Sequence, residues 1–302
     1  MNKDFYKGVI LFALSYFQFI VPSRMANALT VGFFWILFMY GIILIGDGIT
    51  QKLSHKSLIR KIHTDPKGHW HFFLIALIGG IFVEFVAQWF GKLWIYPYFS
   101  IPIYFVCVVF GFYLYWLMIA ESYLAVKSVL DYFIRTKPAA RSFSWEKYFY
   151  FFLGLLGVIL LVGSTYLGYR DYARQGGYVF AINQPVYVMA RFKYVLGLFL
   201  GSWFFLESIE YFKKRTSLIK DLMRGYFHPI IAIAVASFLL ALVMETQNLP
   251  HNFWLYTNWP LPTARFLGLP VVMILAWPLH YIGFLSLFRA FSRKESVDVW
   301  TW

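Results

Sequence analysis

Two carboxylic acids and one histidine of this chain stand within long apolar segments, where ionisable side chains are costly. Glu84 and Glu245 lie toward one end of two such segments, and His280 lies near the middle of a third, two residues after Pro278. An ionisable group in this setting marks, by default, a functional site or a buried pair. We predict that Glu84, Glu245 and His280 are catalytic residues that hold or transfer protons.

Each of these residues also has a purely structural interpretation. The carboxylates could cap loops or pair with a basic side chain, and His280 could satisfy the backbone carbonyl that Pro278 frees within a helix. The basic candidates for such pairs are Arg191, Lys193 and Arg265.

A Trp-x-Tyr motif follows each of the two acids. The copies are Trp94-Ile95-Tyr96 and Trp254-Leu255-Tyr256, 160 residues apart, and the acids before them are 161 residues apart. Aromatic faces stabilise positive charge, although they are also common at membrane interfaces. With nearby amide side chains, the motifs are predicted to line a substrate pocket. The predicted substrate-binding residues are Gln88, Trp89, Trp94, Tyr96, Asn248, Trp254 and Tyr256.

The composition places these residues in a lipid bilayer. Of the 302 residues, 60% are apolar and only 14% are charged. Several apolar stretches reach the roughly 20 residues that a helix needs to cross a bilayer. A soluble enzyme, a disordered chain and a nucleic-acid-binding domain are excluded, and the net charge of +13 is attributed to loops at one membrane surface. We predict an all-α, polytopic integral membrane protein whose partners are the bilayer and an apolar small molecule.

Eight transmembrane helices are predicted from the apolar windows. The first also resembles a signal peptide, because Lys3 and Lys7 precede it and Ala26-Asn27-Ala28 follows it. Whether it is retained or cleaved is left open. The predicted spans are 8–22, 28–49, 71–90, 101–124, 149–168, 188–210, 228–247 and 266–288.

The basic residues predict the orientation of these spans. All but seven of the 27 Lys and Arg residues fall on the side that carries both termini and the loops near 50–70, 127–147 and 213–224. Cytoplasmic loops are enriched in such residues. Both termini are therefore predicted to be cytoplasmic, in a protein that crosses the cell's inner membrane several times. The seven exceptions are Arg24, Lys92, Arg170, Arg174, Arg191, Lys193 and Arg265.

The motifs belong to a larger predicted repeat. Asp47 and Glu207, near the other end of their helices, are also 160 residues apart, and the loops after the motifs end in Ile101-Pro102 and Leu269-Pro270. Because each copy has four spans, both copies have the same orientation and are related by an axis along the membrane normal. The repeats are assigned to residues 1–147 and 148–302, with Glu84 and Glu245 at their common seam.

Other polar residues are given structural roles. The acids near the basic loops are expected to snorkel or to pair with lysines. The single cysteine, Cys107, has no partner, and the sequence has no motif for a nucleotide or metal cofactor, so no cofactor and no metal are predicted. These acids are Asp47, Glu121, Glu207 and Glu210, and the lysines are Lys52, Lys127 and Lys213.

The repeated unit resembles that of a known family. An acid within the membrane, a Trp-x-Tyr motif and a loop ending in an aliphatic residue and proline are similar to the unit of the membrane-embedded lycopene cyclases and carotenoid hydratases. The likeness covers 84–105 and 245–272. In that family paired glutamates follow the proline, whereas here Ile103-Tyr104 and Val271-Val272 follow it.

These features support three hypotheses of function. The first is an isoprenoid- or carotenoid-modifying lyase or isomerase that binds an elongated substrate, because protonating a polyene needs an acid in a dry, aromatic pocket. The second is a small transporter that uses Glu84, Glu245 and His280 as substrate or proton sites. The third is a noncatalytic membrane subunit.

Overall fold

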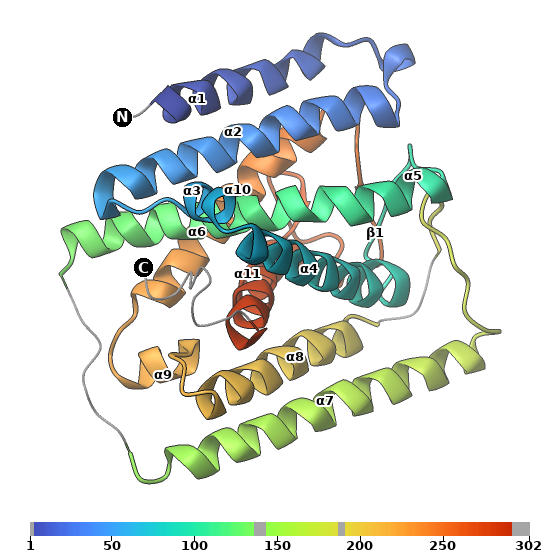
Figure 1. The fold of residues 1–302 in the computed structure, drawn as a ribbon. Coiled ribbons are helices and arrows are strands. Elements are labelled where there is room, and N and C mark those ends of the chain that lie inside the picture. Colours follow the sequence, from blue (N-terminus) through green and yellow to red (C-terminus); the bar gives the residue numbers. More distant parts are fainter. Residues whose placement is uncertain (1–2, 136–142, 187–190, 292–302) are drawn as a thin grey trace.

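The computed structural model describes residues 3–135, 143–186 and 191–291. It is a bundle of helices (Figure 1), which confirms the all-α prediction. Within the described residues, seven helical segments are long and apolar enough to span a membrane, as expected of a multi-pass protein. They are α2 (Ala28–Ser54), α4 (Pro66–Val83) with the π-helix η3 (Glu84–Phe90), α5 (Ile101–Val106) with the π-helix η4 (Cys107–Gly111) and α6 (Phe112–Phe133), α7 (Glu146–Arg174), α8 (Phe192–Phe212), α10 (His228–Asn248) and α11 (Val271–Phe291).

The first predicted span differs from the others. It forms the helix α1 (Lys3–Ser15), which is followed by the short 3₁₀ helices η1 (Tyr16–Ile20) and η2 (Ser23–Met25). The 13 residues of α1 are too few to cross a bilayer as an α-helix. The helix lies along α2 because Gly8 and Gly41 remove the side chains that would keep the two backbones apart.

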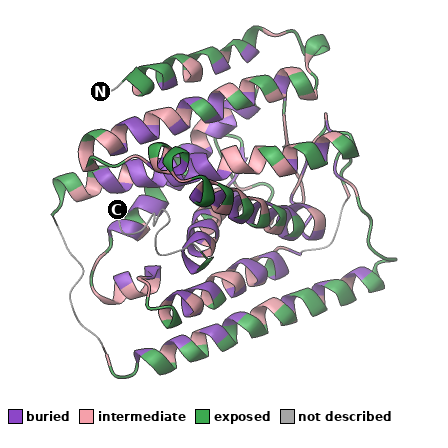
Figure 2. Cartoon of the chain, in the orientation of Figure 1, coloured by how far each residue is buried: buried purple, intermediate pink, exposed green. Residues whose placement is uncertain are grey.

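The helices pack in two groups that contact each other in the middle of the bundle. In one group α1 and α6 pack on α2, and in the other α7 and α11 pack on α8. The groups meet where α6 packs on α10 and α11 packs on α4. Figure 1 shows α1 and α7 at opposite edges of the bundle, and Figure 2 shows buried residues concentrated between them. The division of the chain into two repeats stays a prediction.

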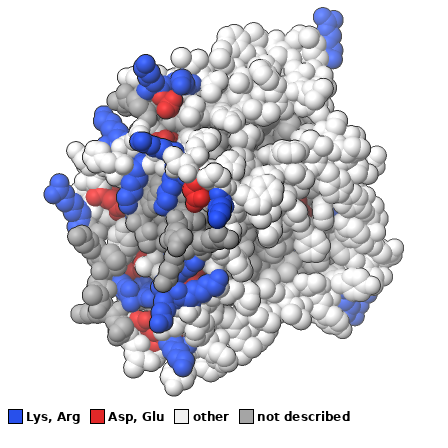
Figure 3. All heavy atoms as spheres, in the orientation of Figure 1, with Lys and Arg blue, Asp and Glu red and all other residues white. Residues whose placement is uncertain are grey.

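Charged side chains gather at one end of the bundle. Figure 3 shows Lys and Arg there, together with most of the visible Asp and Glu. This end carries the short helices α3 (Leu58–Thr64) and α9 (Leu218–Met223). The rest of the visible surface is nearly free of charge, which suits a face in contact with lipid.

Asp47 and Glu207, two of the acids at this end, cap short helices instead of pairing with the expected lysines. Ser57, the residue before α3, donates its hydroxyl to Asp47 (2.9 Å) and accepts from the backbone N–H of Arg60 (3.0 Å). Ser217 is placed likewise before α9, with Glu207 as its carboxylate partner. The expected pairs with Lys52 and Lys213 were wrong, because buried backbone N–H groups need an acceptor.

This capping unit is a further feature that recurs at an offset of 160. The tripeptides Ser57-Leu58-Ile59 and Ser217-Leu218-Ile219 are identical, and the two leucines are fully buried. The sequence contains the signal, but the interpretation of the acids as snorkelling residues missed it.

Removing either cap should destabilise the protein modestly. We expect Ser57→Ala and Ser217→Ala each to lower the free energy of unfolding by about 1 kcal/mol, because an N-cap hydroxyl is lost. Thermal unfolding of purified protein in detergent measures this, with the exposed Ser23→Ala as the control. Equal stability of all three variants would contradict the capping role.

Candidate functional site

The two Trp-x-Tyr motifs lie side by side in the structure. The strands β1 (Trp94–Ile95) and β2 (Leu255–Tyr256) form an antiparallel pair in which Trp94 faces Tyr256 and Ile95 faces Leu255. Ile95 and Leu255 are the residues that the 160-residue offset equates. The two strands of an antiparallel pair are related by a local two-fold axis. Two copies of one motif that are related by such an axis pair through their central residues, as Ile95 and Leu255 do.

Glu84 is held by two tyrosines that come from different elements. Its side chain is 2% exposed at the junction of α4 and η3. Tyr96 donates its hydroxyl to Oε1 (2.6 Å), and Tyr104 of α5 donates to Oε2 (2.7 Å). Trp94 donates its Nε1–H to Tyr96 (3.0 Å), and Trp89 donates to Tyr104 (2.7 Å). Each carboxylate oxygen thus ends a Trp-to-Tyr-to-Glu chain of hydrogen bonds.

The π-helix η3 and the loop after it arrange these groups. A π-helix shifts the residues that follow it around the helix axis relative to an α-helix, and such turns are frequent at functional sites. Gln88, within η3, donates its amide to the carbonyl of Ala181 (2.9 Å). It anchors the loop before α8 and does not contact the carboxylate of Glu84.

The phenol of Tyr96 is a permanent donor to Glu84. Tyr96 lies in the loop after η3, and burial together with the neighbouring Glu84 carboxylate raises its pKa well above the usual value. Its proton is therefore retained at any ordinary pH, and the hydrogen bond to Glu84 persists.

Glu245 is held in a related but different way. Tyr256 donates its hydroxyl to Oε1, and Asn248 donates its amide to Oε2 (3.3 Å). Asn248 also receives the backbone N–H of Trp254 (3.0 Å) and donates to the carbonyl of the same residue (3.1 Å). Asn248 therefore fixes the start of the second motif as well as the acid.

The basic partners proposed as an alternative for these acids have other contacts. The Arg191 guanidinium lies 3.1 Å from the centroid of the Tyr172 ring and donates to Gln175 (2.9 Å). Arg265 donates to the carbonyls of its own loop. No ion pair within the described residues includes Glu84 or Glu245. The structure therefore gives both acids neutral donors.

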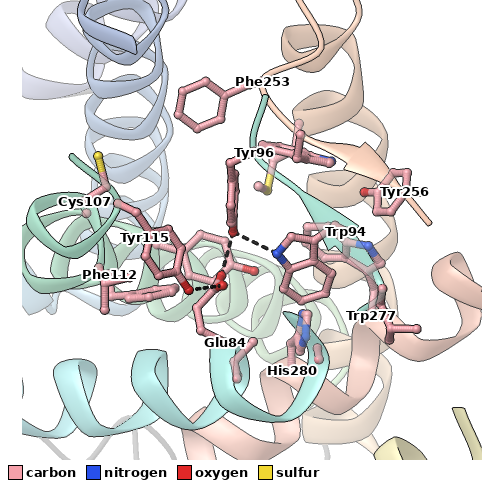
Figure 4. A pocket seen from close by; sticks show the side chains of 18 of the residues that line it. Glu84, Trp94, Tyr96, Cys107, Phe112, Tyr115, Phe253, Tyr256, Trp277 and His280 are labelled. Atoms are coloured by element: carbon pink, nitrogen blue, oxygen red, sulfur yellow. Dashed lines mark hydrogen bonds between the residues drawn. The ribbon is translucent and has the colours of Figure 1, made fainter. Parts of the chain in front are cut away.

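A cavity of about 380 Å³ lies between the two groups of helices. Glu84 and His280 are its ionisable residues apart from tyrosine and cysteine, and most of the remaining lining is aromatic or aliphatic. Figure 4 shows Glu84, Tyr96 and Trp94 pointing toward one another beside it. The predicted site residues that line the cavity are Glu84, Trp94, Tyr96, Trp254, Tyr256 and His280, whereas Gln88, Trp89, Glu245 and Asn248 do not.

His280 faces this cavity from α11. Its ring lies 5.5 Å from that of Phe199 and 5.8 Å from that of Trp277, measured between centroids. Among the described residues, its Nδ1 atom is buried without a hydrogen-bond partner. The side chain therefore does not serve as the partner of the carbonyl freed by Pro278, and it retains a free nitrogen beside the cavity.

Comparison of the chain with models of protein families, with curated proteins and with solved structures found no match. The function is therefore argued from this geometry.

Several lining residues have no signal in the sequence. Tyr104 is the second donor to Glu84, and Tyr115, Phe253 and Trp277 line the same cavity. The chain contains 22 Tyr, 34 Phe and 12 Trp, so residue type alone did not distinguish these four. Tyr104 alone has a link to the repeated unit, because it lies two residues after Pro102, which ends the loop that follows Trp94-Ile95-Tyr96.

A buried lysine lies near the site. Lys92 is 2% exposed, and its Nζ lies 4.8 Å from the centroid of the Tyr178 ring with no hydrogen-bond partner among the described residues. Burial and the neighbouring Arg191 lower the pKa of Lys92 to about 8. Because this is below the usual value, the ammonium costs stability below pH 8, and the cost falls as the pH rises further.

Replacing Lys92 should therefore stabilise the protein in a pH-dependent way. We expect Lys92→Met to raise the free energy of unfolding at pH 7 by about 1 to 2 kcal/mol and the gain to shrink toward pH 10. Thermal unfolding in detergent at both pH values measures it. The exposed Lys193→Met is the matched control. A gain that is absent at pH 7, or that does not depend on pH, would contradict the assignment.

Proposed function

We propose that the cavity binds an elongated apolar molecule of the isoprenoid or carotenoid class and that Glu84 acts on it as an acid. The observation that supports this proposal is a single buried carboxyl group, held by two tyrosines, in a cavity lined mainly by aromatic and aliphatic side chains. The resemblance of the repeated unit to lycopene cyclases and carotenoid hydratases points to the same substrate class.

The proposed chemistry begins with proton transfer to a carbon–carbon double bond. The Glu84 carboxyl gives its proton to one carbon, the π electrons form the new C–H bond, and the adjacent carbon becomes a cation. Tyr96 and Tyr104 stabilise the carboxylate that remains, because their hydroxyls already donate to its two oxygens. Aromatic faces such as those of Trp94 and Trp277 stabilise the cation.

The cation can react in two ways, by losing a proton or by adding water. Loss of a proton from a neighbouring carbon to the Glu84 carboxylate restores the acid and gives an isomer of the substrate. Alternatively, water adds to the cation and then releases a proton to Glu84, which gives a tertiary or secondary alcohol. The free nitrogen of His280 beside the cavity is a second acceptor for either proton.

Binding can be tested with the purified protein and lycopene. A chiral cavity induces circular dichroism in the absorption band of a bound achiral polyene, whereas lycopene in detergent alone shows none. We expect the signal with the natural protein and its loss in Ala276→Trp, which fills the cavity. Ala234→Trp, at an exposed position of α10, is the matched control. No signal with the natural protein, or an equal signal in Ala276→Trp, would overturn the binding proposal.

The transporter hypothesis is the second candidate, supported by Glu84 and His280 on one cavity. A carrier of polar solutes needs a polar path across the bundle. Since most of the cavity lining is apolar, we place this function second. Uptake into proteoliposomes that depends on pH and is lost in His280→Ala would favour it.

A further inference from the structure

We infer that the cavity opens sideways into the bilayer between α2 and η4, and that an apolar chain enters through this opening from the surrounding lipid. The identity of the ligand rests on the proposed function, whereas the opening is inferred from the structure alone. We call the residues at its rim the portal; they are Gly32, Ile36, Val106, Phe110 and Gly111.

The apolar portal residues are exposed although they line the cavity. Ile36 is 47% exposed, Val106 is 57% exposed and Phe110 is 64% exposed. All three lie within membrane-spanning segments. Exposed apolar side chains within a span contact acyl chains, so the opening that they surround faces lipid and not water.

The two portal glycines face empty space. A Cβ atom placed on Gly32 or on Gly111 would meet nothing within 4 Å. By contrast, a Cβ atom on Gly41 would lie 2.7 Å from the backbone of Phe12, which is the usual reason for glycine between helices. Gly32 and Gly111 therefore do not serve close packing, and they leave the rim of the cavity without side chains.

The helices separate where the portal lies. α2 packs closely along α6, but it does not pack closely on η4, the π-helical segment that precedes α6. In Figure 1 this region is at the end of the bundle away from α3 and α9, and in Figure 3 that end has few charges. The portal thus opens in the half of the bilayer opposite the charged end.

The path from the portal leads to Glu84. Cys107 and Phe112, which are next in the chain to Val106 and Gly111 of the portal, line the cavity together with Tyr115, and Figure 4 shows all three on the same side of Glu84. A long chain can therefore place one end beside Glu84 while its remainder stays between α2 and η4 or in the lipid.

Cys107, the single cysteine of the protein, allows a direct test in vesicles. We expect N-cyclohexylmaleimide, which dissolves in the bilayer, to alkylate it at pH 8, and a sulfonated maleimide to react far more slowly. Gly32→Phe should slow the lipophilic reaction at least fivefold, and Gly111→Phe should act likewise. Gly163→Phe, also in a spanning helix with nothing within 4 Å, should react at the natural rate.

The outcomes separate the portal from the proposed function. Equal lipophilic alkylation in Gly32→Phe and Gly163→Phe, or equal reaction of the natural protein with both reagents, would overturn the portal. Adding lycopene to the vesicles should protect Cys107 in the natural protein. Alkylation that depends on Gly32 but is not slowed by lycopene would keep the portal and overturn the ligand class.

Discussion

Glu84→Gln is expected to lower the conversion of a coexpressed carotenoid about a hundredfold or more, whereas Glu245→Gln should change it by less than about threefold. General acid catalysis by one positioned group contributes typically 10² to 10⁴ in rate. Glu84 lines the cavity, while Glu245 is directed to Tyr256 and Asn248 and does not line it. Coexpression with lycopene, followed by chromatography of the pigments, measures the conversion.

The two glutamates serve as mutual controls in this experiment. Both are buried and both accept a tyrosine hydroxyl, so both substitutions replace a carboxyl group with an amide in a similar setting. Protein amount in the membrane must be equal for the comparison. Unchanged pigment with the natural protein would remove the proposed reaction, and equal losses in the two variants would remove the distinct role of Glu84.

The spanning segments could be predicted because hydropathy and length decide them. Seven of the eight predicted spans are found among the described residues as helices that can cross a membrane, although their ends differ by several residues. The segment 8–22 was harder, because Lys3–Ser15 is helical but the chain turns to 3₁₀ geometry from Tyr16. Hydropathy does not register this change of backbone geometry, so it overstated the length of the helix.

The positions of Glu84 and Glu245 along their helices could be predicted, but the geometry around them could not. Spacing along the sequence indicates how far each acid lies from a helix end, and the two Trp-x-Tyr motifs that it singled out form one pair of strands. It does not indicate which side of a helix faces which neighbour. The π-helix at Glu84 shifts that direction, and Tyr104 reaches the acid from a helix 20 residues later. These features depend on tertiary packing and not on local pattern.

Close packing of helices also predicts that one substitution far from the cavity, Gly157→Leu, strongly lowers the stability of the protein. Gly157 of α7 lies against α8, where a Cβ atom would be 2.6 Å from the backbone nitrogen of Phe205 and 2.8 Å from the carbonyl oxygen of Gly201. Backbone atoms cannot turn aside as a side chain can, so Gly157→Leu must push α7 away from α8. We expect the free energy of unfolding to fall by about 3 kcal/mol.

Gly163→Leu supplies the contrast on the same helix. A Cβ atom at Gly163 meets nothing within 4 Å, so the added side chain extends into open space. Thermal unfolding in detergent should therefore show a large loss for Gly157→Leu and little change for Gly163→Leu. An equal change of stability in the two variants would contradict the assignment of the loss to the close contact between α7 and α8. Since no described residue of α7 lines the cavity, lycopene binding by any Gly157→Leu protein that remains folded should match that of the natural protein.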